Sequence, residues 1–120
     1  MTKDIDVIVV GELNVDLIFN QVKGFPEVGK EILSDQMTLA LGSSSAICAS
    51  NLSSLGLRVA FIGKLGNDVY GQFIIDKLKQ SGVDTSMIII DRDLKTGATV
   101  ALSYDEDRAM VTHQGAMSHL

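Results

Sequence analysis

Short apolar runs recur along the first two thirds of the chain and predict the strands of a central sheet. Residues 5–10 form a nearly continuous β-branched run that only Asp6 interrupts, which is typical of a strand buried on both faces. Similar apolar runs at 58–63 and 87–90 predict two further central strands. Three such runs give the chain enough regular apolar structure for a folded core.

Helical spacing fills the intervals between these runs. Residues 43–55 and 68–80 carry apolar positions at helical intervals, and we expect those positions to face the core. The apolar positions are Ile47, Leu52 and Leu55 in the first segment and Val69, Phe73, Ile74 and Leu78 in the second. Serines can cap the first helix, and Asn67 or Asp68 can cap the second. Strands that alternate with helices predict an α/β fold.

Other segments read as strands outside the central sheet. Residues 12–17 alternate polar with apolar, 32–41 do so as a half-exposed strand, and 98–104 and 109–113 flank an acidic turn at 105–108. The spacing of the last pair predicts a β-hairpin with a solvated tip.

Composition excludes several functional classes. The 120 residues suffice for one domain or a piece of one, and 15 acidic against 10 basic residues, with no basic stripe, argue against a nucleic acid partner. Cys48 is the only cysteine, so no internal disulfide can form, and we expect it to be buried filler on a packed helix in a reducing compartment. The run 7–10 is far too short to span a membrane, so we expect a cytoplasmic protein without a membrane partner.

A first candidate site follows the first predicted strand. If residues 12–17 are extended, Asn14 and Asp16 share one face, just beyond the carboxyl end of a strand, where α/β sheets bind ligands. A carboxylate accepts hydroxyl hydrogens and an amide both donates and accepts, so the pair can hold a polyol. The alternative is that both side chains only end a strand in solvent.

A second candidate is Gly42 with the serines that follow it. A helix that starts here offers free N–H groups, and the hydroxyls of Ser43 and Ser44 can add contacts, although ordinary serine capping explains them equally well. The segment at 42–45 lacks the Gly-Lys-Ser/Thr of a P-loop. After Gly11 the next glycine is Gly24, so no dinucleotide fingerprint is present either.

The two histidines, His113 and His119, form no metal-binding pattern, and we predict no metal ligand here.

Taken together, these motifs resemble the N-terminal part of the ribokinase-like carbohydrate kinases, the PfkB family. The resemblance covers nearly all of the chain, and its motifs are IDVIVVGELNVDLIF, the FPEVG turn at 25–29, and the run LGSSSAICASNLSSLGLRVAFIGKLGNDVYG at 41–71. It implies a three-layer α/β/α core with a small β lid at about 17–40 and 98–113.

The resemblance also implies an activity. Family members transfer the γ-phosphoryl group of ATP, with Mg²⁺, to a hydroxyl of a sugar or nucleoside. By resemblance, Asn14 and Asp16 would bind substrate hydroxyls, Gly42, Ser43 and Ser44 would line the same pocket, and the lid would cover the substrate and pair two subunits as a homodimer.

Three departures from the family pattern qualify this expectation. Ser43 replaces the second glycine of a pair. Ile47 stands where an asparagine often contacts substrate, which disfavours ribose, and Met117 follows Gly115-Ala116 where asparagine is common.

The second family signature, which supplies the catalytic base and anion hole, is missing. We therefore expect residues 1–120 to be the substrate-side part of a kinase, inactive alone and prone to self-association. The alternatives are a non-catalytic sugar-binding or oligomerisation module and, more weakly, a flavodoxin- or Rossmann-like nucleotide binder.

Overall fold

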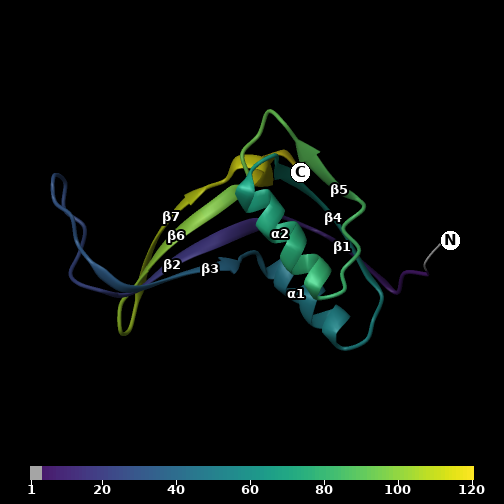
Figure 1. The fold of residues 1–120 in the computed structure, drawn as a ribbon, viewed down its shortest axis with the longest axis horizontal. Coiled ribbons are helices and arrows are strands. Elements are labelled where there is room, and N and C mark those ends of the chain that lie inside the picture. Colours follow the sequence, from purple (N-terminus) through teal and green to yellow (C-terminus); the bar gives the residue numbers. More distant parts are fainter. Residues whose placement is uncertain (1–3) are drawn as a thin grey trace.

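A computed structural model describes residues 4–120 as an elongated molecule of 56 × 33 × 18 Å, with a helix-covered sheet and a second sheet that extends away from it (Figure 1). We call the second sheet, made of β2, β3, β6 and β7, the lid. The elements are β1 (Val7–Val10), β2 (Asn14–Val22), β3 (Ser34–Leu41), α1 (Ser44–Ser54), β4 (Val59–Gly66), α2 (Val69–Gln80), β5 (Ile88–Asp91), β6 (Gly97–Ser103), β7 (Arg108–His113) and the 3₁₀ helix η1 (Gly115–His119).

The central sheet has the order β1-β4-β5, and all three strands are parallel. The three central strands and the two helices predicted from the sequence are therefore confirmed. Both α1 and α2 pack on one face, where a single core contains Phe61 and Leu65 of β4 and Ile74 and Leu78 of α2, each fully buried.

The prediction that residues 5–10 are buried on both faces is wrong. Val7 and Val9 of β1 pack against the core, whereas Ile8 and Val10 are 56% and 61% exposed. The reason is that α1 and α2 cover one face of this sheet, so the alternate side chains of β1 point to the other face. Ile89 of β5, at the other edge, is 56% exposed.

Helix α1 faces the core with its small residues. Ala46 and Ala49 are fully buried, whereas Ile47 and Leu55, expected in the core, are 46% and 80% exposed. Cys48 is also exposed, so its prediction as buried filler is wrong. Alanine faces let the helix lie close to the sheet, and the larger side chains therefore turn outward. In α2, Val69 is likewise exposed, although the rest of its predicted stripe packs inward.

The lid has the order β3-β2-β6-β7. β2 and β6 are parallel, and the other two pairs are antiparallel, with β6 and β7 joined as the predicted hairpin. Strands form at the segments where the sequence predicted them, and β2 is longer than expected. Figure 1 shows the lid projecting to the left, beyond both helices.

Asp68 joins the lid to the central sheet. Its carboxylate caps α2 by accepting from Gly71 N at 2.9 Å, and it also accepts from Thr96 N at 2.9 Å and Thr96 Oγ1 at 2.6 Å, just before β6. Thr96 Oγ1 in turn accepts from Gly66 N at the end of β4. Burial would raise the pKa of Asp68, but the hydrogen bonds from Thr96 and Gly71 outweigh it, so the pKa is lowered. We call Asp68 and Thr96 the clasp.

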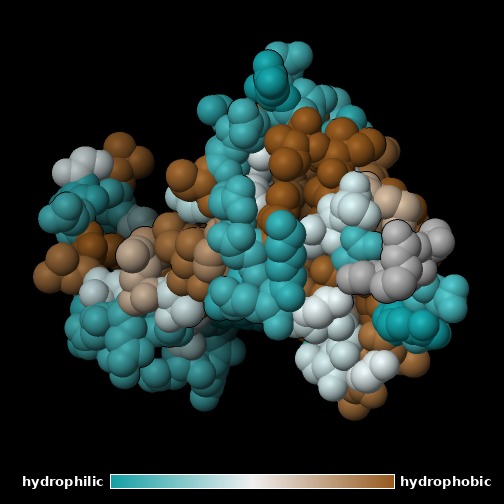
Figure 2. Space-filling view, turned by 45° about the vertical axis from the view of Figure 1, so that its right-hand side comes forward, coloured by the Kyte–Doolittle hydropathy of each residue, from teal (hydrophilic) through white to brown (hydrophobic). Residues whose placement is uncertain are grey.

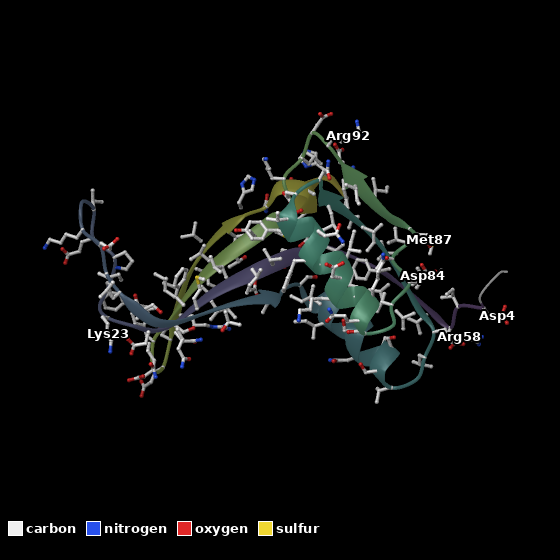
Figure 3. All side chains as sticks on the ribbon, viewed as in Figure 1. Asp4, Lys23, Arg58, Asp84, Met87 and Arg92 are labelled. Atoms are coloured by element: carbon white, nitrogen blue, oxygen red, sulfur yellow. The ribbon has the colours of Figure 1, made fainter. Side chains whose placement is uncertain are left out.

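At the end of the molecule opposite the lid, Arg58 forms ion pairs with acidic side chains near the start of β1. Arg58 donates to both carboxylate oxygens of Asp6 and lies near Asp4, and Figure 3 shows this group far from Lys23, which follows β2. The hydrogen bonds from Arg58 lower the pKa of Asp6.

Candidate functional site

Asn14 and Asp16 lie at the start of β2, three residues after Gly11, where the chain has just left the central sheet. They occupy one face of β2, as predicted, and Asn14 Nδ2 donates to Asp16 Oδ1 at 3.3 Å. Asn14 is only 7% exposed, because it lies between the buried Leu13 and Val15. This pair forms the base of the lid, where the lid meets the helix-covered sheet.

Gly42 completes the group. Its N–H donates to the backbone oxygen of Asn14 at 2.9 Å, which places its Cα directly over the two polar side chains. A Cβ at Gly42 would lie 2.5 Å from Asn14 Oδ1 and 2.7 Å from Asp16 Oδ1. The two oxygens therefore converge on a space that only glycine leaves open.

Ser43 serves mainly as a cap. Its hydroxyl donates to the backbone oxygen of Glu12 and accepts from Ala46 N at 3.5 Å, which confirms the capping interpretation. Its φ of 71° is in the left-handed region, where glycine is the easier residue. Ser44, on the first turn of α1, is exposed, as is Ile47. Direct substrate contacts of Ser43, Ser44 and Ile47 therefore stay predictions.

Two residues of the site escape sequence reasoning. Thr99 Oγ1 on β6 accepts from Asn14 Nδ2 at 3.3 Å, and Thr99 is within 2.8 Å of Thr112 Oγ1 on β7. Alternation within β6 gives the face of Thr99, but no sequence signal pairs β6 with β2 across 85 positions. The parallel pairing of these two strands brings Thr99 beside Asp16.

The polar groups present suit hydroxyl recognition. Asn14 Oδ1 and the Asp16 carboxylate are acceptors, and they stand at the base of the lid beside Gly42. Within residues 4–120, no three His, Cys, Asp or Glu side chains cluster to hold a metal ion. His113 and His119 are both exposed. Of the helices in this part of the chain, none is long and apolar enough to cross a membrane.

Comparison with known sequences points to sugar kinases. The family model for "pfkB family carbohydrate kinase" matches residues 4–120. The chain is 34% identical over 106 residues to the 5-dehydro-2-deoxygluconokinase of Geobacillus kaustophilus, covering 87% of this chain and 29% of that protein. It is 38% identical over 104 residues to the corresponding Bacillus thuringiensis enzyme, with the same coverage of 87% and 29%.

Solved structures agree on the fold. The fructokinase of Halothermothrix orenii superposes with a TM-score of 0.81 at 29% identity, covering 97% of this chain and 40% of that one. Arabidopsis thaliana ribokinase, complexed with ribose and ATP, gives a TM-score of 0.85 at 25% identity, covering 92% and 36%. The α/β, ribokinase-like fold is thereby confirmed, and the chain spans about 30% of the length of the curated relatives.

Proposed function

The chain belongs to the pfkB family of carbohydrate kinases, and on that premise we propose that it is the substrate-binding and lid part of an ATP-dependent sugar or nucleoside kinase. The observation that carries the proposal is the convergence of Asn14 Oδ1 and the Asp16 carboxylate on the space left by Gly42. These two hydrogen-bond acceptors would bind hydroxyl hydrogens of the sugar and hold it at the base of the lid. Closure of the lid then excludes water that would compete for the phosphoryl group.

ATP and Mg²⁺ are proposed for a protein of the length of the relatives. Within residues 4–120 no three His, Cys, Asp or Glu side chains cluster, and the sequence has no P-loop, so no residue of this chain is assigned to either group. We therefore derive no step through them. The 120 residues alone are expected to bind a sugar but to turn over no ATP, in a cytoplasmic setting, and ATP-dependent sugar phosphorylation by this purified chain would contradict that expectation.

The substrate that receives the phosphoryl group is proposed to be a deoxy sugar acid. Relatives at 34% to 38% identity are named 5-dehydro-2-deoxygluconokinases. Ile47 presents an apolar side chain, 46% exposed, on the first turns of α1 beside Gly42 and Ser43. An apolar contact suits a carbon that lacks a hydroxyl, whereas a buried hydroxyl facing isoleucine would lose its hydrogen bond to water.

Substituting Ile47→Asn is expected to shift sugar preference. Wild type should bind 5-dehydro-2-deoxy-D-gluconate about tenfold more tightly than 5-dehydro-D-gluconate, because one unpaired hydroxyl costs roughly 1–3 kcal/mol. The Ile47→Asn variant should reverse that preference, as measured by calorimetric titration. Leu55→Asn, at the 80% exposed C-cap of α1, is the control and should leave the preference unchanged. An unchanged ratio in the Ile47 variant would refute the substrate assignment.

Homodimerisation through the lid is the second part of the proposal. An open apolar groove of about 570 Å³ lies on the lid, and its walls include Phe19, Leu33, Met37 and Leu102. Leu33 and Met37 are 69% and 63% exposed. Figure 2 shows brown, hydrophobic atoms gathered on the projecting part of the molecule at left. A second lid that covers this groove would remove the apolar surface from water.

A lysine substituted into the groove tests the dimer. The Met37→Lys variant is expected to sediment as a monomer under conditions in which wild type sediments as a dimer, because a desolvated lysine opposes the contact. Val28→Lys, at a fully exposed loop position outside the groove walls, is the matched control and should stay dimeric. Monomeric wild type, or a dimer that survives Met37→Lys, would exclude this interface.

A non-catalytic sugar-binding or oligomerisation module is the remaining candidate. The same acceptor pair and the same lid groove favour it. Sugar binding or self-association by the 120 residues fits both proposals. A reading frame that continues past Leu120 into a Gly-Ala-Gly-Asp segment would favour the kinase.

A further inference from the structure

A row of polar side chains crosses three strands of the lid at its base. Asp16 on β2 is the register partner of Thr99 on β6, and Thr99 is the partner of Thr112 on β7. Register partners on neighbouring strands point to the same face of a sheet. Thr99 and Thr112 therefore lie on the face that carries Asn14 and Asp16.

The amide of Asn14 has one orientation that its neighbours permit. Nδ2 lies 3.3 Å from Thr99 Oγ1, 3.3 Å from Asp16 Oδ1 and 3.4 Å from the backbone oxygen of Val15. A 180° rotation would turn Oδ1 toward the Asp16 carboxylate and the Val15 oxygen, neither of which can donate. The amide N–H groups therefore face the protein, and Oδ1 faces the space at Gly42.

Thr99 is the uncharged side chain that accepts a hydrogen bond from the Asn14 amide. It is 8% exposed, so its hydroxyl hydrogen also needs an acceptor, and Thr112 Oγ1 at 2.8 Å provides one. Thr112 itself is exposed and can donate to solvent. The chain of hydrogen bonds thus runs from Asn14 through Thr99 to Thr112 at the edge strand of the lid.

We propose that Thr99 is a positioning residue: together with the Asp16 carboxylate and the Val15 oxygen it holds the Asn14 amide with Oδ1 toward the space at Gly42, where Asn14 and Asp16 would select a ligand with two neighbouring hydroxyl donors. The selection rests on the proposed function, whereas the orientation of Asn14 does not. A carbonyl or carboxylate oxygen of the ligand would meet two acceptors and be rejected. The 3,4-diol of a sugar acid fits this requirement.

The first test reads the amide directly. In wild type, the side-chain N–H signals of Asn14 should show magnetisation transfer to the Thr99 methyl group and slow exchange with water. Thr99→Val keeps the shape but removes the hydroxyl, and it should speed that exchange about tenfold. Thr99→Ser should restore the wild-type signals. Thr38→Val is the control, because Thr38 lies on the same lid face and makes no side-chain hydrogen bond within residues 4–120. Unchanged Asn14 signals in Thr99→Val would overturn the proposal.

The second test reads selection, with 5-dehydro-2-deoxy-D-gluconate, D-fructose and D-ribose as probes. Whichever sugar binds wild type should bind Thr99→Val about tenfold more weakly and Thr99→Ser nearly normally. Equal weakening by valine and serine would overturn the role of the hydroxyl. If none of the probes binds wild type, sugar binding by these residues and the selection inferred from it both fail, while the Asn14 signals still decide its orientation.

Discussion

Gly42→Ala should weaken sugar binding about 100-fold, a larger effect than its cost in stability. The added Cβ would lie 2.5 Å from Asn14 Oδ1 and 2.7 Å from Asp16 Oδ1, so both oxygens must turn away. Turning them away breaks hydrogen bonds of the nearly buried Asn14 amide, so the free energy of unfolding should also fall, by roughly 1–3 kcal/mol. The affinity for the sugar, measured by calorimetric titration, should fall about 100-fold, because both acceptors are displaced together.

Gly56→Ala is the reciprocal control for that prediction. Gly56 ends α1 with φ +99°, and nothing lies within 4 Å of a Cβ built there. Alanine in this conformation should cost about 1 kcal/mol of folding free energy, measured by urea unfolding, with sugar affinity unchanged. If Gly42→Ala loses only stability and keeps its affinity, the placement of the sugar beside Gly42 is refuted.

Asp68→Ala should be the more destabilising change. The carboxylate accepts three hydrogen bonds, two from Thr96 and one from Gly71, and Thr96 is only 3% exposed. Loss of the helix cap and of acceptors for buried donors should lower the free energy of unfolding by roughly 2–3 kcal/mol, measured in urea. Asp76→Ala, on the exposed side of α2, should cost far less. Equal unfolding midpoints for the two variants would contradict the clasp.

Asp68 also predicts a pH dependence with a definite sign. Its folded-state pKa is lowered by the hydrogen bonds from Thr96 and Gly71, which outweigh burial. The stability that it contributes is therefore fully present above the unfolded-state pKa of about 4 and is lost as pH falls through the lower folded-state value. The difference in stability between wild type and Asp68→Asn should be constant from pH 7 to about pH 5 and shrink below that. A difference that grows on acidification would contradict this sign.

Local chemistry was sufficient to identify several elements from the sequence. The β-branched run of β1 predicted a strand, and Asp68 was recognised as a possible cap of α2. Alternation along β2 placed Asn14 and Asp16 on one face, because side chains of a strand alternate whatever surrounds it. These features depend only on residues close in the chain.

Burial could not be predicted in the same way. Ile47 and Cys48 read as core positions by hydrophobicity, yet Ala46 and Ala49 face the sheet. Ile8 and Val10 read as doubly buried, but both helices lie on the opposite face of the sheet. Which side of an element faces the core depends on how closely helix and sheet approach, and that distance is a property of the assembled layers.

The sequence by itself determined the elements, the family resemblance and the polar pair at the start of β2. Only the tertiary structure decided that Gly42 leaves the space on which Asn14 and Asp16 converge, and that Thr99 lies beside Asn14. The physical reason is that parallel pairing of β2 with β6 brings Asn14 and Thr99 together, although they are 85 positions apart in the chain. Periodicity encodes the face of each side chain, whereas the partner strand is chosen by the packing of the whole chain.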